Sequence, residues 1–203
     1  LGDISLDNGY ADALIFYGDQ TIKGIGGGVC QVSTTLFRTA FHSGFPILER
    51  HAHAYRVSYY EQTASGANAD LAGLDATVYV PLVDLKFTND TPYWLLMETY
   101  VRGNSLTWKF YSNSDGRTVE WQTSGPQNTV EPPEPLYREN PDLEKGVVNQ
   151  VDWEAAGADV IITRYVYRGG TLYFQDEIKT HYLPWQAIYE YGPGTEGIPT
   201  PEP

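Results

Sequence analysis

The chain contains one cysteine, Cys30, and it lies where a glycine-rich run turns into a helical pattern. The run before it contains Gly24, Gly26, Gly27 and Gly28, which permit positive φ and let backbone amides point into a cleft. A cysteine in the first turn of a helix meets unpaired N–H groups and the positive end of the helix dipole. Both lower the pKa of the thiol and favour the nucleophilic thiolate. We therefore predict that Cys30 is a nucleophile in covalent catalysis.

Two histidines and an aspartate follow Cys30 and supply the groups that a thiol nucleophile needs. Segment Ile47–Tyr60 is rich in β-branched and aromatic residues and predicts a strand, whose period of two puts His51 and His53 on one face. Asp75 comes at the start of the next predicted strand. Cysteine, histidine and a third, orienting group follow in this order in papain-like and transglutaminase-like enzymes, where the histidine takes the thiol proton.

Each of these residues also has a simpler explanation. A lone cysteine among apolar residues is often a small buried hydrophobe, and a glycine run before a helix is compatible with phosphate binding. The sequence has neither a P-loop motif nor a strand-linked GxGxxG. His51 and His53 could form half of a metal site or an exposed polar strand face, and Asp75 could close a turn. With one thiol and no HExxH, we expect no metal and no cofactor.

The predicted helix and hairpin that flank the glycine run would position the cysteine. Apolar residues recur at helical spacing at Val29, Val32, Leu36, Phe37, Ala40 and Phe41. Gly44, with Pro46 beyond it, predicts the end of this helix. Upstream, residues 11–16 and 21–25 predict a hairpin with its turn near Gly18-Asp19.

Beyond Asp75 the sequence predicts β structure. Residues 76–83 predict a strand, and two further hairpins are expected around Gly103-Asn104 and Gly169-Gly170. We predict an α+β fold in which the helix that bears the nucleophile packs on an antiparallel or mixed β-sheet. A small β-rich C-terminal extension would follow this core.

The proline content suggests where the chain divides. Residues 125–142 contain five prolines, a density that favours extended, polyproline-like backbone. The predicted divisions are a cysteine catalytic domain (1–124), a proline-rich linker or strap (125–142), a β-hairpin extension (143–191) and a flexible tail (192–203).

Composition limits the class of protein. At 203 residues with 41% hydrophobic content, the chain can bury a substantial core, and one cysteine excludes an internal disulfide. The net charge of −13 argues against nucleic acid as a partner. No apolar run is long enough to span a membrane and no signal peptide is visible, so we expect a piece of a longer envelope protein.

Three segments together resemble a known family. The chain is similar to the VanW domain family of bacterial cell-envelope proteins over about residues 1–97. The similarity lies in the runs GGGVCQVSTTL, ERHAH and GLDATVYVPLVDLKFTNDTPYWLL. That family is associated with glycopeptide-resistance clusters, and some members are reported to act as L,D-transpeptidases with the motif cysteine as nucleophile. The resemblance implies that Cys30 is the nucleophile, His51 and His53 are the histidine pair, and Asp75 belongs to the D-A-T-V segment.

Two departures from the family pattern matter. The family often has serine after the second histidine, where this chain has Ala54. The link from the histidines to D-A-T-V is usually short, so residues 61–72 read as an insertion that would cover or reshape the cleft.

The resemblance and the residues together predict a cysteine acyltransferase that acts on peptidoglycan stem peptides, in the bacterial cell envelope or outside the cell. Cys30 would form a thioester with a donor peptide, and His53, or His51 in its place, would take the thiol proton. Asp75 would orient that histidine. The backbone amides of Gly28, Val29 and Gln31 would form the oxyanion hole.

The alternative prediction is a protein without catalytic activity. In it the chain is a non-catalytic envelope module that binds peptidoglycan or a glycopeptide-related ligand, and Cys30 is structural. Neither reading needs nucleic acid or insertion of this segment into a membrane, and the sequence gives no oligomeric state.

Overall fold

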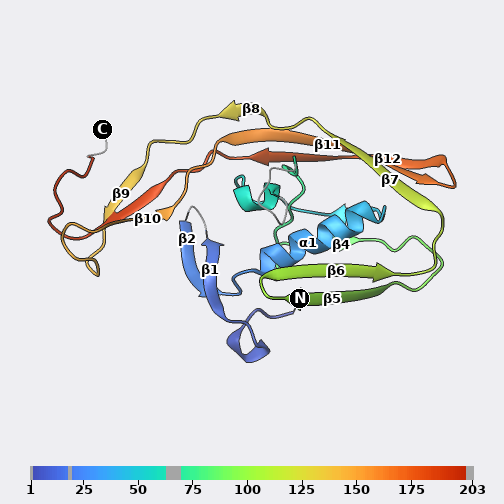
Figure 1. Cartoon of the computed structure of the whole chain (residues 1–203), viewed down its shortest axis with the longest axis horizontal. Helices are drawn as coiled ribbons and strands as arrows, with labels where there is room; N and C mark the ends of the chain where they lie inside the picture. The colour runs from blue at the N-terminus through green and yellow to red at the C-terminus, as the bar shows by residue number, and fades with distance from the viewer. Residues whose placement is uncertain (1, 18–19, 63–69, 200–203) are drawn as a thin grey trace.

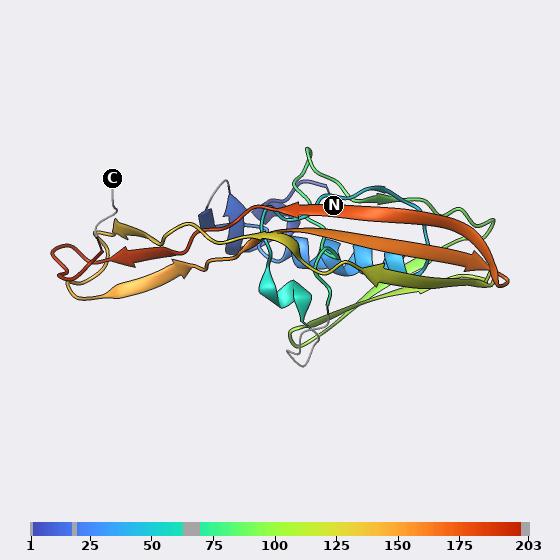
Figure 2. The ribbon, with the colours of Figure 1, turned by 90° about the horizontal axis from the view of Figure 1, so that it is seen from above.

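The computed structural model describes residues 2–17, 20–62 and 70–199. Within these ranges the chain has one α-helix, two short 3-10 helices and thirteen strands, which form five small sheets. A long antiparallel hairpin runs along one side of the helix, and a second hairpin lies on the opposite side (Figure 1). Seen from above, the molecule is elongated, with a small sheet near the C-terminus at one end (Figure 2).

The elements follow one another in this order: η1 (Leu6–Asn8), β1 (Asp12–Tyr17), β2 (Gln20–Ile25), α1 (Val29–His42), β3 (Ile47–Glu49), η2 (Ser58–Glu61), β4 (Lys86–Phe87), β5 (Leu96–Arg102), β6 (Ser105–Tyr111), β7 (Arg117–Thr123), β8 (Gln127–Val130), β9 (Leu136–Glu139), β10 (Val148–Asp152), β11 (Gly157–Arg168), β12 (Thr171–Tyr182) and β13 (Ile188–Tyr191). The main sheet has the order β12-β11-β7, with β8 also paired to β11.

The predicted α+β class is wrong, because the chain is mostly β. In the described ranges α1 is the single α-helix, and strands dominate from β5 to β13. The helix also does not pack on one broad sheet, since the strands around it are divided among separate small sheets. The physical reason is that pairing is divided. Three hairpins pair sequence neighbours, and the remaining strands pair with different partners, so no single sheet collects them.

The helix α1 begins where predicted. Its N-cap, Gly28, has φ 89°, a left-handed conformation that glycine adopts without steric cost. The most deeply buried large side chains of the helix are Phe37 and Phe41, which pack in a core with Val160 and Ile162 of β11. The buried face of the helix therefore looks toward the long β11–β12 hairpin.

Two arginines from the main sheet hold the C-terminal end of α1. Arg164 of β11 is fully buried, and its Nη1 donates to the carbonyls of Phe41 (3.0 Å) and Phe45 (3.1 Å). Its Nε donates to Asp176 Oδ1 at 2.9 Å. Arg117 of β7 donates to the Gly44 carbonyl at 2.7 Å. Cations at a helix C-terminus stabilise carbonyls that have no partner within the helix.

Three predicted hairpins are confirmed. Strand β1 pairs with β2 in antiparallel register, although its predicted turn at Gly18-Asp19 lies outside the described residues. Strand β5 pairs with β6 so that Arg102 faces Ser105. Strand β11 pairs with β12 across Gly169-Gly170, both of which have positive φ.

Two predicted strands are wrong. Only Ile47–Glu49 of the predicted strand 47–60 is a strand, and Ser58–Glu61 is a 3-10 helix. Residues 76–83 form isolated bridges instead of a strand, from Thr77 to His51 and from Tyr79 to Val83. In both segments, hydrogen bonds made by buried polar side chains, described below, take the place of the backbone hydrogen bonds of a strand.

The proline-rich segment contains two of the strands. Strand β8 pairs with β11, and β9 pairs in parallel with β13, which also pairs with β10. The division into domains stays a prediction. No helix in the described part of the chain is both long enough and apolar enough to cross a membrane.

Candidate active site

The cysteine lies in the first turn of α1, on the helix side that faces the Asp75 segment. Its Sγ lies 3.2 Å from Thr77 Oγ1 and 3.8 Å from the Val78 carbonyl oxygen. The sulfur also interacts electrostatically with the side chain of His53, and each group shifts the pKa of the other toward its charged form. The thiol is therefore partly buried and has two polar side chains that can stabilise a thiolate.

The histidine is fixed by the aspartate through two atoms. His53 Nδ1 lies 2.6 Å from Asp75 Oδ2, and the backbone amide of His53 donates to the same oxygen at 2.8 Å. The side chain of His53 is only 4% exposed, and its ring lies 5.0 Å from the ring of Tyr60, centroid to centroid. Because Nδ1 is held by the carboxylate, Nε2 is the ring nitrogen that remains for the sulfur.

The aspartate is in turn held by two residues on its other oxygen. Arg50 Nη2 donates to Asp75 Oδ1 at 3.0 Å, and the Tyr182 hydroxyl donates to the same oxygen. Arg50 is itself fixed, with Nη2 donating to the Gly73 carbonyl at 2.8 Å and Nη1 to Thr180 Oγ1 at 2.8 Å. Both carboxylate oxygens thus accept two hydrogen bonds, which suits a buried charge.

The electrostatics of the site favour a charged sulfur and a charged imidazole. Burial opposes the charge on Cys30, but the hydrogen bonds from His53 and Thr77 outweigh it, so the pKa of the thiol lies below its ordinary value. Burial also opposes the charge on His53, but Asp75 and Cys30 together raise the pKa of the imidazole to about 9. The surroundings of both groups therefore favour the thiolate and the imidazolium over the neutral thiol and the neutral imidazole.

The carboxylate stays ionised over the same range. Burial would raise the pKa of Asp75, but the hydrogen bond from His53 and the charge of Arg50 lower it to about 2. A group whose pKa is depressed on folding stabilises the fold above its unfolded value, and this stabilisation is lost as the pH falls toward 2. The raised pKa of His53 works in the opposite sense, and its stabilisation is lost as the pH rises through about 9.

The helix is bonded directly to the segment that carries the aspartate. Thr34 Oγ1 donates to the Ala76 carbonyl at 3.1 Å and accepts from the Ala76 amide at 3.0 Å. Ser33 Oγ also donates to the Ala76 carbonyl. The helix turn that bears Cys30 and the loop that bears Asp75 are therefore held together by side chains of α1.

A family model described as "VanW like protein" matches residues 1–111, which is more than half of the chain. The matched range includes Cys30, His53 and Asp75. The chain belongs to this VanW-like family. The family identified from the sequence motifs is thus confirmed.

Two curated relatives share part of this VanW-family chain. It is 32% identical over 107 residues to the uncharacterized protein YoaR of Bacillus subtilis strain 168, an alignment that covers 53% of this chain and 32% of YoaR. It is 33% identical over 85 residues to the vancomycin B-type resistance protein VanW of Enterococcus faecalis, which covers 42% of this chain and 29% of that protein. The chain thus spans about a third of the length of these relatives.

Two solved structures align with a smaller part of the chain. The G5 domain of an IgA1 protease is 22% identical, with a TM-score of 0.23, and covers 39% of this chain and 93% of that domain. The G5 domain of HP0197 is 17% identical, with a TM-score of 0.18, and covers 37% of this chain and 97% of that domain. TM-scores this low support no conclusion about the VanW-family chain.

The first histidine of the VanW-family motif, His51, lies apart from His53. His51 has a side chain that is 49% exposed, and its Nε2 lies 3.2 Å from Glu49. The prediction that His51 and His53 share one strand face is wrong, because β3 ends at Glu49 and His53, unlike His51, is buried. In the described parts of the chain, no group of three or more histidine, cysteine or acidic side chains is arranged to hold a metal ion.

The predicted oxyanion-hole amides are largely occupied. The Val29 amide donates to the Gly26 carbonyl at 3.2 Å, and the Gln31 amide donates to the Gly28 carbonyl at 3.1 Å. The amide of Cys30 itself makes no hydrogen bond to a described backbone carbonyl. The amide of Gly28 likewise makes no hydrogen bond to a described backbone carbonyl, so the start of the helix leaves the amides of Gly28 and Cys30 for an oxyanion.

Four supporting residues of the VanW-family site were missed from the sequence: Arg50, Thr77, Thr180 and Tyr182. Arg50 and Thr77 adjoin predicted site residues, so their positions in ERHAH and D-A-T-V could have signalled a role. Thr180 and Tyr182 lie more than a hundred positions downstream of the residues that they contact, and no local pattern connects them.

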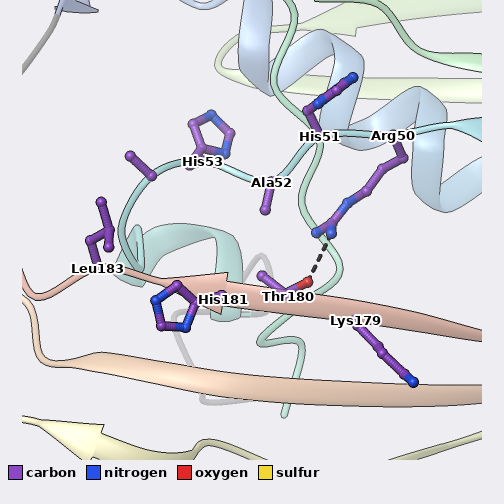
Figure 3. Close-up of a pocket in the computed structure, with 9 residues that line it drawn as sticks. Arg50, His51, Ala52, His53, Lys179, Thr180, His181 and Leu183 are labelled. Atoms are coloured by element: carbon purple, nitrogen blue, oxygen red, sulfur yellow. Dashed lines mark hydrogen bonds between the residues drawn. The ribbon is translucent and has the colours of Figure 1, made fainter.

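A shallow groove of about 420 Å³ lies beside the site, between residues 50–54 and the end of β12 (Figure 3). Arg50 reaches across it to Thr180, whereas the ring of His53 points away from it (Figure 3). The two exposed cationic groups on its β12 side have acidic partners, since Lys179 pairs with Glu177 and His181 with Asp159. Cys30 is not among the lining residues, so the groove supplies no atom to an attack by the thiol.

The thiolate of this VanW-family chain gives a first prediction. Iodoacetamide reacts with the thiolate, and the pKa of Cys30 is lowered. In the folded chain the labelling rate of Cys30 should therefore stay high at pH values at which an ordinary cysteine is already protonated and reacts slowly. His53→Gln removes the neighbouring charge that helps to lower this pKa, so labelling at pH 7 should slow by roughly tenfold, the usual smallest effect of a nearby opposite charge on ionisation. Intact-mass analysis over time measures this rate.

The motif supplies a matched control. His51→Gln changes the neighbouring exposed histidine and should leave the labelling rate unchanged. Equal slowing in both variants, or none in His53→Gln, would show that the imidazole does not set the charge of the sulfur.

Proposed function

We propose that this chain is a domain of the bacterial cell envelope and that it transfers acyl groups through Cys30. The envelope assignment rests on membership of the VanW-like family and on the relative named for vancomycin resistance. The acyl-transfer assignment rests on one observation, the chain of contacts from Cys30 through His53 to Asp75. A buried structural cysteine does not need a histidine that is itself oriented by a buried, fully hydrogen-bonded carboxylate.

The first half of the proposed reaction makes a thioester. The Cys30 thiolate attacks the carbonyl carbon of an L,D peptide bond in a peptidoglycan stem peptide, and a carbon–sulfur bond forms. The amide of Cys30 stabilises the resulting oxyanion at the positive end of α1. The carbon–nitrogen bond then breaks, and the imidazolium of His53 gives its Nε2 proton to the departing amine of the terminal D-residue.

The second half returns the enzyme to its starting state. An acceptor amine attacks the thioester carbonyl, and neutral His53 takes the proton that this amine loses. The carbon–sulfur bond breaks, and the thiolate and the imidazolium are restored. Throughout the cycle Asp75 keeps its charge and holds the Nδ1 proton of His53.

Intact-mass analysis tests this function. The folded chain is mixed with a synthetic tetrapeptide donor that ends in a D-residue, or with a carbapenem, a β-lactam that acylates a reactive thiol. We expect a covalent adduct on Cys30 in the wild-type chain and none in Cys30→Ala. His53→Gln should form the adduct at least tenfold more slowly, because its thiol is less ionised.

A non-catalytic envelope module is the second candidate. It is supported by membership of the VanW-like family and by the relative named for vancomycin resistance, both of which fit an envelope module without requiring catalysis. If the wild-type chain forms no adduct with either reagent, or if Cys30→Ala forms the same adduct, the acyl-transfer proposal fails. Retention of peptidoglycan by Cys30→Ala as well as by the wild type would then support the binding module.

A further inference from the structure

A second groove, of about 390 Å³, lies on the opposite side of the chain's helix from the long hairpin. It is formed where the chain enters β5 and leaves β6, and its lining consists of Pro92, Tyr93, Trp94, Tyr111, Ser112 and Asn113. The side chain of Trp94 is almost wholly uncovered, with the residue 96% exposed. An indole this exposed contributes almost nothing to the core and offers a flat apolar face to a ligand.

The backbone that presents these rings is held by hydrogen bonds. The Ser112 hydroxyl donates to the Trp94 carbonyl at 2.9 Å, which ties the two ends of the groove together. Asn89 Nδ2 donates to the Tyr93 carbonyl at 2.8 Å, and the Tyr93 amide donates to Thr91 Oγ1 at 3.3 Å. The groove is therefore formed before any ligand arrives, which limits the entropy that binding costs.

The core beneath the hairpin is filled by other side chains. Phe45, Phe87 and Phe110 form a compact aromatic cluster, with ring centroids 5.7 to 6.1 Å apart. Trp94 is not part of this cluster. Packing of the hairpin against the helix therefore does not account for the tryptophan, or for its position beside two tyrosines.

The chemistry of the lining selects the ligand. The lining residues carry aromatic rings, a hydroxyl and an amide, but no carboxylate, ammonium or guanidinium. The chain as a whole has a net charge of −13, which repels anions, and the groove offers a cation no counter-charge. A neutral ring with an apolar face and polar edges fits this combination, because its face stacks on the aromatics while its edges bond to the amide and hydroxyl.

We propose that this groove binds a neutral pyranose saccharide, stacked on Trp94. Figures 1 and 2 show that the groove end of β5 and β6 lies toward the C-terminal end of α1, whereas Cys30 lies at the N-terminal end. The groove and the thiol therefore lie toward opposite ends of this 14-residue helix. Saccharide binding here leaves Cys30 accessible and does not depend on acyl transfer.

Titration of the full chain with chitotetraose and with cellotetraose tests the proposal. The indole N–H resonances of the five tryptophans are followed by NMR. We expect one resonance, absent in Trp94→Ala, to shift saturably with at least one of the two saccharides, and Trp94→Ala to bind at least tenfold more weakly. A response to chitotetraose alone would add that the acetamido group is part of the recognised ligand.

The chain offers a matched control for loss of an exposed tryptophan. Trp153 is 61% exposed and lies outside this groove, so Trp153→Ala should bind within twofold of the wild type. The proposal is overturned if neither saccharide binds at millimolar concentration, or if Trp94→Ala binds as the wild type does. It is also overturned if Trp94→Ala only changes a monomer–dimer equilibrium, since the groove would then be a contact between copies of the chain.

Discussion

Asp75→Asn is expected to lower the rate of acyl transfer by about 10³- to 10⁴-fold, the loss seen when the acid of such a triad becomes an amide. The asparagine side chain has the same shape but presents an NH₂ group to either His53 or Arg50. Facing His53, it cannot accept the Nδ1 proton, so the imidazole adopts the tautomer that cannot serve as a base toward Cys30. Facing Arg50, it leaves a buried guanidinium without its counter-charge. The rate of adduct formation with the tetrapeptide donor measures the effect.

A second readout separates this effect from simple unfolding. The pKa of His53, about 9 in the wild type, should fall in Asp75→Asn because the largest source of its elevation is gone. Ring-proton NMR of the histidines measures this shift. Asp159→Asn is the matched control, since Asp159 holds Nδ1 of His181 at 2.6 Å in the same way but on the surface. If the two variants retain equal activity, Asp75 has no role in the reaction.

Arg164→Met should destabilise the fold by about 1–3 kcal/mol, because the fully buried guanidinium gives up its hydrogen bonds to the carboxylate and to two carbonyls. The guanidinium bonds to Asp176 and to the last carbonyls of α1, and it lies 4.8 Å from the centroid of the Phe41 ring. Methionine fills similar space but removes the donor to the Phe45 carbonyl and one of the donors to the Phe41 carbonyl. Urea denaturation should show a lower midpoint with an unchanged slope.

An exposed ion pair provides the comparison. Arg138 pairs with Glu190 at 3.0 Å, with side chains 35% and 21% exposed, so Arg138→Met should cost less than about 1 kcal/mol. Similar urea midpoints for the two variants would mean that the burial of Arg164 does not increase its contribution to the stability of the fold.

Local patterns predicted much of the site. The apolar spacing after Gly28 placed Cys30 in the first turn of a helix, and the chain order of cysteine, histidine and carboxylate named the groups that the structure brings together. Paired glycines or Gly-Asn marked two of the hairpin turns. These features depend on residues that lie close together in the sequence, where backbone preference and side-chain period decide the outcome.

The predictions failed where distant residues decide the conformation. The predicted strand at 47–60 ends at Glu49, and the next residue, Arg50, turns inward to Asp75 and Thr180. That turn separates His51 from His53, which strand periodicity had put on one face. The fold class was wrong for a related reason, since the number and size of sheets depend on which strands pair, and sequence period does not specify partners.

The position of Tyr182 in the chain determines when, during synthesis, the site is complete. Synthesis runs from the N-terminus, so Cys30, His53 and Asp75 leave the ribosome long before Tyr182, which lies 107 positions after Asp75. The core that buries α1 also waits for Val160 and Ile162. A nascent chain that ends before β12 therefore lacks the bonds of Thr180 and Tyr182 to Arg50 and Asp75, and the site is completed only once synthesis has passed beyond the region that the family model matches.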